Sequence, residues 1–252
     1  MRAFYDLKNR ARTPLGMSNY LAVMFVFLFN VMLYQRSRWA ILFVVLVLAT
    51  MSRTGMGFLL ISVAFWIADR AGRLRQLIVV GAIGTLLCVL PAVLMWDQVR
   101  ALPGVESLAY RARYMDMAGE PIAAHPIAGT PRSETVRLYG YPITWHPHNS
   151  ILHLLVVFGV IGTVAYAAYL SVVLGAFGHR ARESPLWRGI TAGTVVLLLW
   201  SLVEVIVMSP AFEVLIGGLY ALACATMPGT RAAQSLDLGS TSPPATPGAS
   251  GA

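Results

Sequence analysis

The sequence predicts an all-α, polytopic membrane protein with about seven transmembrane helices and one large extracytoplasmic loop. Of its 252 residues, 57% are apolar and only 12% are charged, which is about half the charged share of a soluble domain. The apolar residues are grouped in runs nearly free of charge. In lipid such runs form helices, because the backbone must satisfy its own hydrogen bonds there. The runs are 21–33, 39–51, 55–68, 77–95, 151–177, 190–208 and 212–227.

Two of these runs, 39–51 and 55–68, are shorter than the roughly 20 residues that span a bilayer. As separate helices they would be joined by a tight turn at 52–54 on the outer side. The alternative is a single tilted helix over 39–68, with the N-terminus inside. That helix would hold Arg53 near the bilayer centre, which costs about 3 kcal/mol or more.

The distribution of arginine orients the helices, because Lys and Arg in short loops favour the cytoplasm. Arginine clusters at 70–75 and 180–188 are therefore predicted to be cytoplasmic. The polar stretch 97–147 between them has five Arg and five acidic residues, so it is neutral, as an exported loop should be. We expect short helices near 106–118 in this loop, which would lie over the membrane as a lid. This orientation leaves residues 1–17 outside.

The net charge of +8 is dispersed over the loops. This dispersion favours contact with membrane lipids and speaks against nucleic-acid binding, which needs a clustered basic face. The end of the chain is rich in Ser, Thr, Pro, Gly and Ala, which is typical of disorder. The predicted parts are an extracytoplasmic segment 1–17, a membrane domain 18–227 with its extracytoplasmic loop 97–148, and a disordered tail 228–252.

The most informative motif is His146-Pro147-His148-Asn149-Ser150, which directly precedes the fifth apolar run. Asn is a good N-cap residue, and the proline ends whatever element precedes it, so Asn149 should cap the outer end of a helix. Nine residues follow Asn149 before Gly159, and Gly162 comes three residues later. We expect both glycines to lie on one helix face and to permit close packing with a neighbouring helix.

This arrangement resembles the signature of the O-antigen ligase and polymerase superfamily. The signature is His, then Asn, Ser or Gln, nine residues, Gly, two residues, and a Gly, Thr or Tyr; His148, Asn149, Gly159 and Gly162 match it throughout. Three further stretches resemble family segments in the same order. They are 16–22, similar to an Asn-x-(Leu/Ala)-Ala helix start; 50–55, similar to a Thr-x-Ser-Arg-x-(Gly/Ala) turn; and 111–129, similar to a loop helix that ends in His-Pro-Leu-x-Gly.

The sequence also departs from the family pattern. Met115 stands where members commonly have Trp, and Pro131 stands where they often have a second Gly. Gly119 and Pro121 should interrupt the loop helix. Members have further membrane helices before the segment that 16–22 resembles, so the chain is similar to the C-terminal half of a typical member.

The resemblance implies a multi-pass glycosyltransferase of the bacterial cytoplasmic (inner) membrane that acts in lipopolysaccharide or other polysaccharide biosynthesis. Its donor would be a glycan on undecaprenyl diphosphate. Its acceptor would be lipid A-core, a growing glycan or a protein, and the sequence leaves ligation, polymerisation and protein O-glycosylation open. Two other interpretations remain: a transporter or channel subunit, and an inactive fragment of a family member.

Glycan transfer requires that the acceptor hydroxyl lose its proton and that the leaving diphosphate be neutralised. The sequence has no Asp-x-Asp pair for a divalent metal, so we expect a metal-independent reaction without a cofactor. Arginine forks can hold phosphate oxygens instead, which makes Arg53 and Arg111 catalytic candidates. His148 is the candidate base, because its side chain titrates near neutral pH.

Four residues are candidates for substrate binding: Asn149, Arg113, His153 and Glu204. Simpler roles stay open for the catalytic candidates. Arg53 would then extend to lipid headgroups from a helix end, Arg111 would form surface ion pairs in the loop, and His148 would cap a helix at the interface. No zinc site is expected, because no Cys lies near the histidines.

Overall fold

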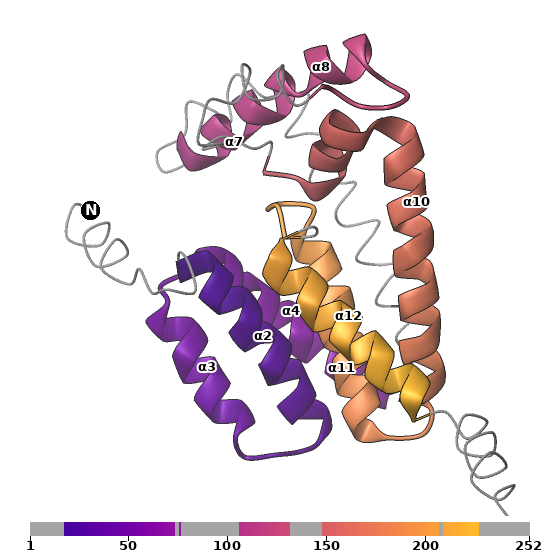
Figure 1. Ribbon diagram of the computed structural model, residues 1–252. Helices are drawn as coiled ribbons and strands as arrows, with labels where there is room; N and C mark the ends of the chain where they lie inside the picture. Colours follow the sequence, from indigo (N-terminus) through magenta and orange to yellow (C-terminus); the bar gives the residue numbers. More distant parts are fainter. Residues whose placement is uncertain (1–17, 74–75, 77–105, 132–147, 207–208, 227–252) are drawn as a thin grey trace, which may run out of the picture.

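A computed structural model shows that the described part of the chain is helical, without any strand (Figure 1). The predicted all-α class is confirmed for these residues. The predicted helix 77–95, the N-terminal segment 1–17 and the tail 228–252 lie outside them. The described residues are 18–73, 76, 106–131, 148–206 and 209–226.

The helices follow the predicted apolar runs, with two additional short helices in the loop. Helix α7 confirms the short helix expected near 106–118, and the break before α8 falls at Ala118, beside Gly119 and Pro121. Within the described residues, α10 alone is both long and apolar enough to cross a bilayer by itself, and α2, α3, α11 and α12 are shorter apolar helices. The helices are α2 (Ser18–Tyr34), α3 (Ala40–Ala49), α4 (Arg53–Arg70), α7 (Glu106–Met117), α8 (Gly119–Ala124), α10 (Ser150–Ala181), α11 (Pro185–Trp200) and α12 (Pro210–Ala225).

Helix α2 forms the centre of the bundle and packs on α3, α4 and α11. Two glycines of α11 permit the closest of these approaches. A Cβ atom at Gly189 would lie 2.7 Å from the Cα of Val31, and one at Gly193 would lie 2.8 Å from the ring of Phe27. Small residues at helix interfaces allow backbones to come this close, so α2 and α11 form the tightly packed core of the bundle.

A buried polar contact also connects α2 to α4. The Nδ2 of Asn30 donates hydrogen bonds to the Oγ of Ser62 and to the carbonyl of Val26, each at 2.8 Å. Side-chain hydrogen bonds of this kind stabilise helix pairs in an apolar environment. Asn30, one of the few polar residues deep in the apolar runs, therefore serves helix packing.

The connection between α3 and α4 is a tight turn, as predicted. Helix α3 ends at Ala49, Met51 has a positive φ of 52°, and Ser52 caps α4 by accepting a hydrogen bond from the Gly55 nitrogen at 3.1 Å. The alternative of one continuous helix over 39–68 is wrong, because the chain reverses its direction at this turn (Figure 1).

Helix α10 is broken at Gly159, where φ is 61° and ψ is −165°. This region of backbone conformation is essentially restricted to glycine. The expectation that Gly159 and Gly162 share one face of a continuous helix is therefore wrong. Gly159 instead allows close approach of a loop, because a Cβ there would overlap the carbonyl of Ile127. A Cβ at Gly162 would overlap the side chain of Phe158, one turn earlier in the bent helix.

The two ends of the bundle differ in composition. Helices α7 and α8 lie across one end, where the α3–α4 turn and the start of α10 are also found; we call it the site end (Figure 1). The α2–α3 and α10–α11 connections lie at the opposite end, which we call the basic end (Figure 1). The described arginines of the site end are Arg53, Arg111 and Arg113. Those of the basic end are Arg36, Arg38, Arg70, Arg73, Arg180, Arg182 and Arg188.

Candidate active site

Glu204 joins two of the predicted residues at the site end. It lies in the connection between α11 and α12, and only 9% of its side chain is exposed. One carboxylate oxygen, Oε1, lies 3.0 Å from Nδ1 of His148, and the other, Oε2, lies 3.5 Å from Nη2 of Arg111. These residues are 56 and 93 positions from Glu204 in the sequence. A buried carboxylate with partners on both oxygens is far better compensated than an isolated one.

The start of α10 holds His148 in place. Asn149 is the N-cap, as predicted, and its Oδ1 accepts hydrogen bonds from the nitrogens of Ile151 and Leu152 at 2.9 and 3.0 Å. Its Nδ2 donates to the carbonyl of Leu202 at 2.9 Å. His148 itself has a positive φ of 47°, an uncommon conformation for a residue with a Cβ. The cap therefore also fixes the histidine against the segment that carries Glu204.

Ser150 strengthens this attachment from inside the protein. It is buried, and its nitrogen donates to the carbonyl of Ser201 at 2.8 Å. Its hydroxyl donates to the carbonyl of Glu204 and accepts from the nitrogen of Ile206, both at 3.1 Å. Main chain and side chain of one residue thus hold the connection after α11 in a fixed, non-helical conformation.

Helix α7 supplies Arg111 from above the site (Figure 1). The Nη1 of Arg111 donates to the carbonyl of Val203 at 2.8 Å, and Tyr114, one turn later, places its ring centre 5.9 Å from that of His148. Tyr114 is buried. Residues three apart lie on one helix face, so the same face of α7 contacts both Glu204 and His148.

A backbone clasp anchors the loop that carries α7 and α8. The nitrogen of Thr130 donates to the carbonyl of Val156 at 2.7 Å, and the nitrogen of Val160 donates to the carbonyl of Pro126 at 2.8 Å. These bonds form on both sides of Gly159, at the break in α10. The break therefore frees backbone groups that bind the His125-Pro126-Ile127-Ala128-Gly129 segment, and this contact positions the loop over the site.

The hydrogen bond to Glu204 determines the chemistry that is open to His148. If Glu204 is ionised it only accepts hydrogen bonds, and a neutral imidazole would then carry its proton on Nδ1 and have Nε2 as its basic atom. A carboxylate in this position orients the ring and stabilises the imidazolium that forms when Nε2 takes a proton. The geometry therefore suits a general base.

The remaining candidates are less closely connected. Arg53 begins α4 at the site end, and its exposed guanidinium has no hydrogen bond or ion pair among the described residues. Arg113 is exposed on α7, and His153 is half-buried in the first turn of α10. The structure thus joins His148, Arg111, Asn149 and Glu204 in one network, while Arg53 and Arg113 lie at the same end without a hydrogen bond or ion pair to another described residue.

Two residues of the network were not predicted from the sequence. Tyr114 follows Arg111 at helical spacing, and that spacing could have indicated it. Ser150 directly follows the His-Asn pair, but its contacts lie more than 50 residues away in the sequence, so no local pattern reveals its role. Among the described residues, no group of three or more His, Cys, Asp and Glu side chains is placed to hold a metal ion.

Comparison with known proteins places these residues in a family context. Residues 39–167, about half of the chain, match the family described as O-antigen ligase. The match includes Arg53, Arg111 and His148, and it ends before Glu204. Searches of curated proteins and of solved structures gave no match.

Proposed function

The chain belongs to the O-antigen ligase family, and from this premise we propose that it transfers a glycan from an undecaprenyl-diphosphate carrier at the outer face of the bacterial cytoplasmic membrane. Family membership supports ligase or polymerase activity in general, in a membrane protein. The donor, the site residues and the orientation are proposals. The observation that carries the proposed site is the contact of one buried carboxylate with both His148 and Arg111.

In the proposed reaction, the oxygen of an acceptor hydroxyl attacks the anomeric carbon of the donor glycan. The bond between that carbon and the phosphate oxygen breaks, and the diphosphate leaves with the bonding electrons. Nε2 of His148 takes the hydroxyl proton, and Glu204 stabilises the resulting imidazolium. A positioned base of this kind contributes typically about 10²–10⁴-fold to the rate.

Arginine neutralises the leaving diphosphate in this proposal. Arg111 already donates to Val203 and Glu204, so its guanidinium is fixed in position and keeps its charge next to His148. The guanidinium group of Arg53 has no partner within the described part of the chain. A fixed cation where charge develops stabilises the transition state without reorganisation, and a second, free fork can bind phosphate oxygens bidentately.

We also propose that the protein spans the membrane several times, with the site end outside. The short-loop arginines are concentrated at the basic end, which by the positive-inside rule faces the cytoplasm. Large apolar side chains also point outward from several helices, including Ile41 (69% exposed), Leu60 (72%), Val164 (61%) and Val214 (77%). An apolar outer surface of this kind fits a lipid environment.

The acceptor depends on the surface that α7 and α8 present over the site. Lipid A-core, a growing glycan and a protein all supply a hydroxyl group, and the proposed proton transfer suits each of them. Deleting the gene separates the first two. Loss of a ligase leaves long polymer on the lipid carrier, whereas loss of a polymerase leaves single repeats. An unchanged glycan profile would favour the transporter alternative or an inactive fragment of a family member.

The proposal is tested by glycan transfer in membranes of a deletion strain that expresses single variants. We expect His148→Ala and Arg111→Ala to abolish consumption of the lipid-linked glycan while membrane insertion stays normal. Arg38→Ala, which removes an exposed arginine of the basic end, serves as the matched control and should retain activity. Full activity of both site variants would refute the proposed site. Full activity of Arg53→Ala alone would assign Arg53 to lipid headgroups.

A further inference from the structure

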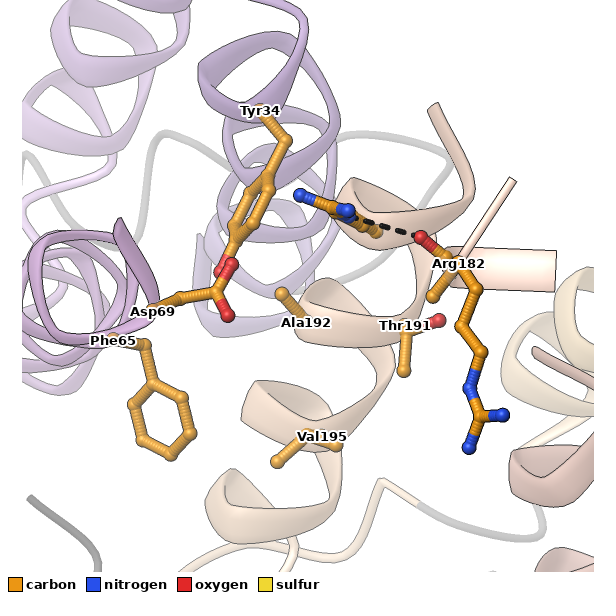
Figure 2. A pocket seen from close by; sticks show the side chains of 9 residues that line it. Tyr34, Phe65, Asp69, Arg182, Thr191, Ala192 and Val195 are labelled. Atoms are coloured by element: carbon orange, nitrogen blue, oxygen red, sulfur yellow. Dashed lines mark hydrogen bonds between the residues drawn. The ribbon is translucent and has the colours of Figure 1, made fainter. Parts of the chain in front are cut away.

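A cavity opens at the basic end, far from His148. Residues of α2, α4 and α11, the end of α10 and the turn before α11 line a space of about 390 Å³. An adjoining space of about 460 Å³ shares Tyr34, Asp69 and Arg188 with it. Figure 2 shows the hydroxyl of Tyr34 next to the carboxylate of Asp69 at this cavity, with Phe65 and Val195 along its wall. We call the two spaces together the basic cavity.

The charge of the basic cavity is strongly positive. Among the described residues that line it, four are arginines, namely Arg36, Arg70, Arg182 and Arg188, and one is a carboxylate, Asp69. Asp69 lies beside the hydroxyl of Tyr34 (Figure 2) and forms no ion pair with a described arginine. The arginines are all exposed. The cavity therefore carries an uncompensated positive charge that would attract an anion.

Two of these guanidinium groups are held in place by contacts that leave their charge available. The Nε of Arg188 donates to the carbonyl of Ala181 at 3.0 Å, and the Arg70 guanidinium lies 4.6 Å above the ring of Trp66. Neither forms an ion pair among the described residues. A guanidinium group that is held in place, with its terminal nitrogens not engaged by a described residue, suits the oxygens of a phosphate group, which arginine can bind bidentately.

The cavity becomes apolar away from its rim. Phe65 precedes Asp69 by one helical turn on α4, while Ala192 and Val195 follow Arg188 by one and two turns on α11. Residues at this spacing lie on one helix face, so an apolar wall extends from the charged rim toward the middle of the bundle. A free phosphate would use only the rim, whereas a lipid would use both parts.

We propose that the basic cavity binds an anionic phospholipid, with the headgroup phosphate between Arg70 and Arg188 and an acyl chain along Phe65 and Val195. Basic pockets between membrane helices on the cytoplasmic side are suited to such headgroups. This inference rests on the proposed membrane orientation, but it concerns a surface that takes no part in the proposed glycan transfer, so failure of one would leave the other untouched.

The test measures lipid retained by the full-length protein after extraction from nanodiscs that contain phosphatidylglycerol and phosphatidylethanolamine. Native mass spectrometry should show preferential retention of phosphatidylglycerol by the unchanged protein. Each basic side chain near the surface is worth roughly fivefold in affinity, so Arg70→Gln with Arg188→Gln should weaken retention roughly 30-fold. The control Arg38→Gln with Arg73→Gln removes the same charge from the same end but from outside the cavity, and should change retention less than about twofold.

Two further experiments distinguish a lipid phosphate from free phosphate and control for misfolding of the variants. Millimolar inorganic phosphate should displace little phosphatidylglycerol; complete displacement would identify a free-phosphate site and overturn the lipid assignment. Arg70→Lys with Arg188→Lys preserves the charge and should retain most of the binding. Equal loss in the cavity and control variants, or equal retention of both lipids by the unchanged protein, would overturn the proposal.

Discussion

The site end and the basic end both carry arginine, but they hold it differently. At the site end, Arg111 is tied through the buried carboxylate of Glu204 to His148. At the basic end, the Arg70 guanidinium lies over the ring of Trp66 and Arg188 donates a hydrogen bond to the carbonyl of Ala181, and neither forms an ion pair among the described residues. A cation coupled to a histidine suits chemistry, whereas exposed, uncompensated cations suit membrane orientation and anion binding.

The largest expected effect is a difference in cysteine labelling between the two ends. The site end and the basic end should lie on opposite sides of the membrane. In a chain whose two cysteines are replaced by Ala, Arg53→Cys should react with a membrane-impermeant maleimide in intact spheroplasts. Arg182→Cys should react only after permeabilisation. Labelling of both positions from the same side would contradict the proposed placement of the two ends on opposite sides of the membrane.

Replacing Gly159 should release the loop from the site end. Gly159→Ala forces a Cβ into a backbone region reserved for glycine and against the carbonyl of Ile127, which should lower the free energy of unfolding by about 3 kcal/mol. Gly175→Ala, later in the same helix with nothing within 4 Å of the added Cβ, is the matched control. Unfolding in detergent micelles measures both, and equal stability would contradict the proposed clasp.

Neutralising Glu204 should affect activity more than stability. Glu204→Gln removes the charge that orients His148 and holds Arg111, and we expect glycan transfer to fall roughly 10²-fold, the lower bound for a positioned base. Glu183→Gln, which breaks an exposed ion pair with Arg180 at the basic end, should leave transfer unchanged. Comparable losses in the two variants would show that a general charge effect, and no specific orientation of His148, is responsible.

The smallest effect is expected at the helix cap. Asn149→Ala removes both the cap of α10 and the bond to Leu202, and should lower stability by about 1 kcal/mol. Asn149→Asp keeps the capping oxygen but loses the donor to Leu202, so it should retain most of the stability while disturbing the site. Thermal unfolding and transfer assays together separate the two contributions; identical behaviour of both variants would argue against a role for the Leu202 bond.

The helices could largely be predicted because apolar runs reveal lipid-compatible segments directly. The run 55–68 corresponds to α4 (Arg53–Arg70) with extensions of two residues at each end. The run 190–208 did not reveal where its helix ends. The helix begins at Pro185, behind the Ser184 cap, and stops at Trp200. Leu202, Val203 and Ile206 are apolar, so composition cannot distinguish the irregular connection from a continuing helix.

The site could be predicted only residue by residue. The motifs that resemble the family's indicated His148 and Arg111, and the place of Glu204 near the end of an apolar run indicated that residue. The sequence around each residue does not predict that the three make contact. The position of the loop that carries Arg111 depends on the break at Gly159, and hydrophobic patterning does not detect a single residue with a positive φ. The partner of that break, the segment ending at Gly129, lies 30 residues earlier in the sequence.

The most direct test asks whether His148 and Glu204 act as one unit in glycan transfer. Rates are measured for His148→Ala, Glu204→Gln and the double variant in the same membranes. If the carboxylate works through the histidine, the double variant should be as slow as His148→Ala alone, because residues that act as a unit are strongly non-additive. A double variant slower by the product of the two single effects would contradict the proposed coupling.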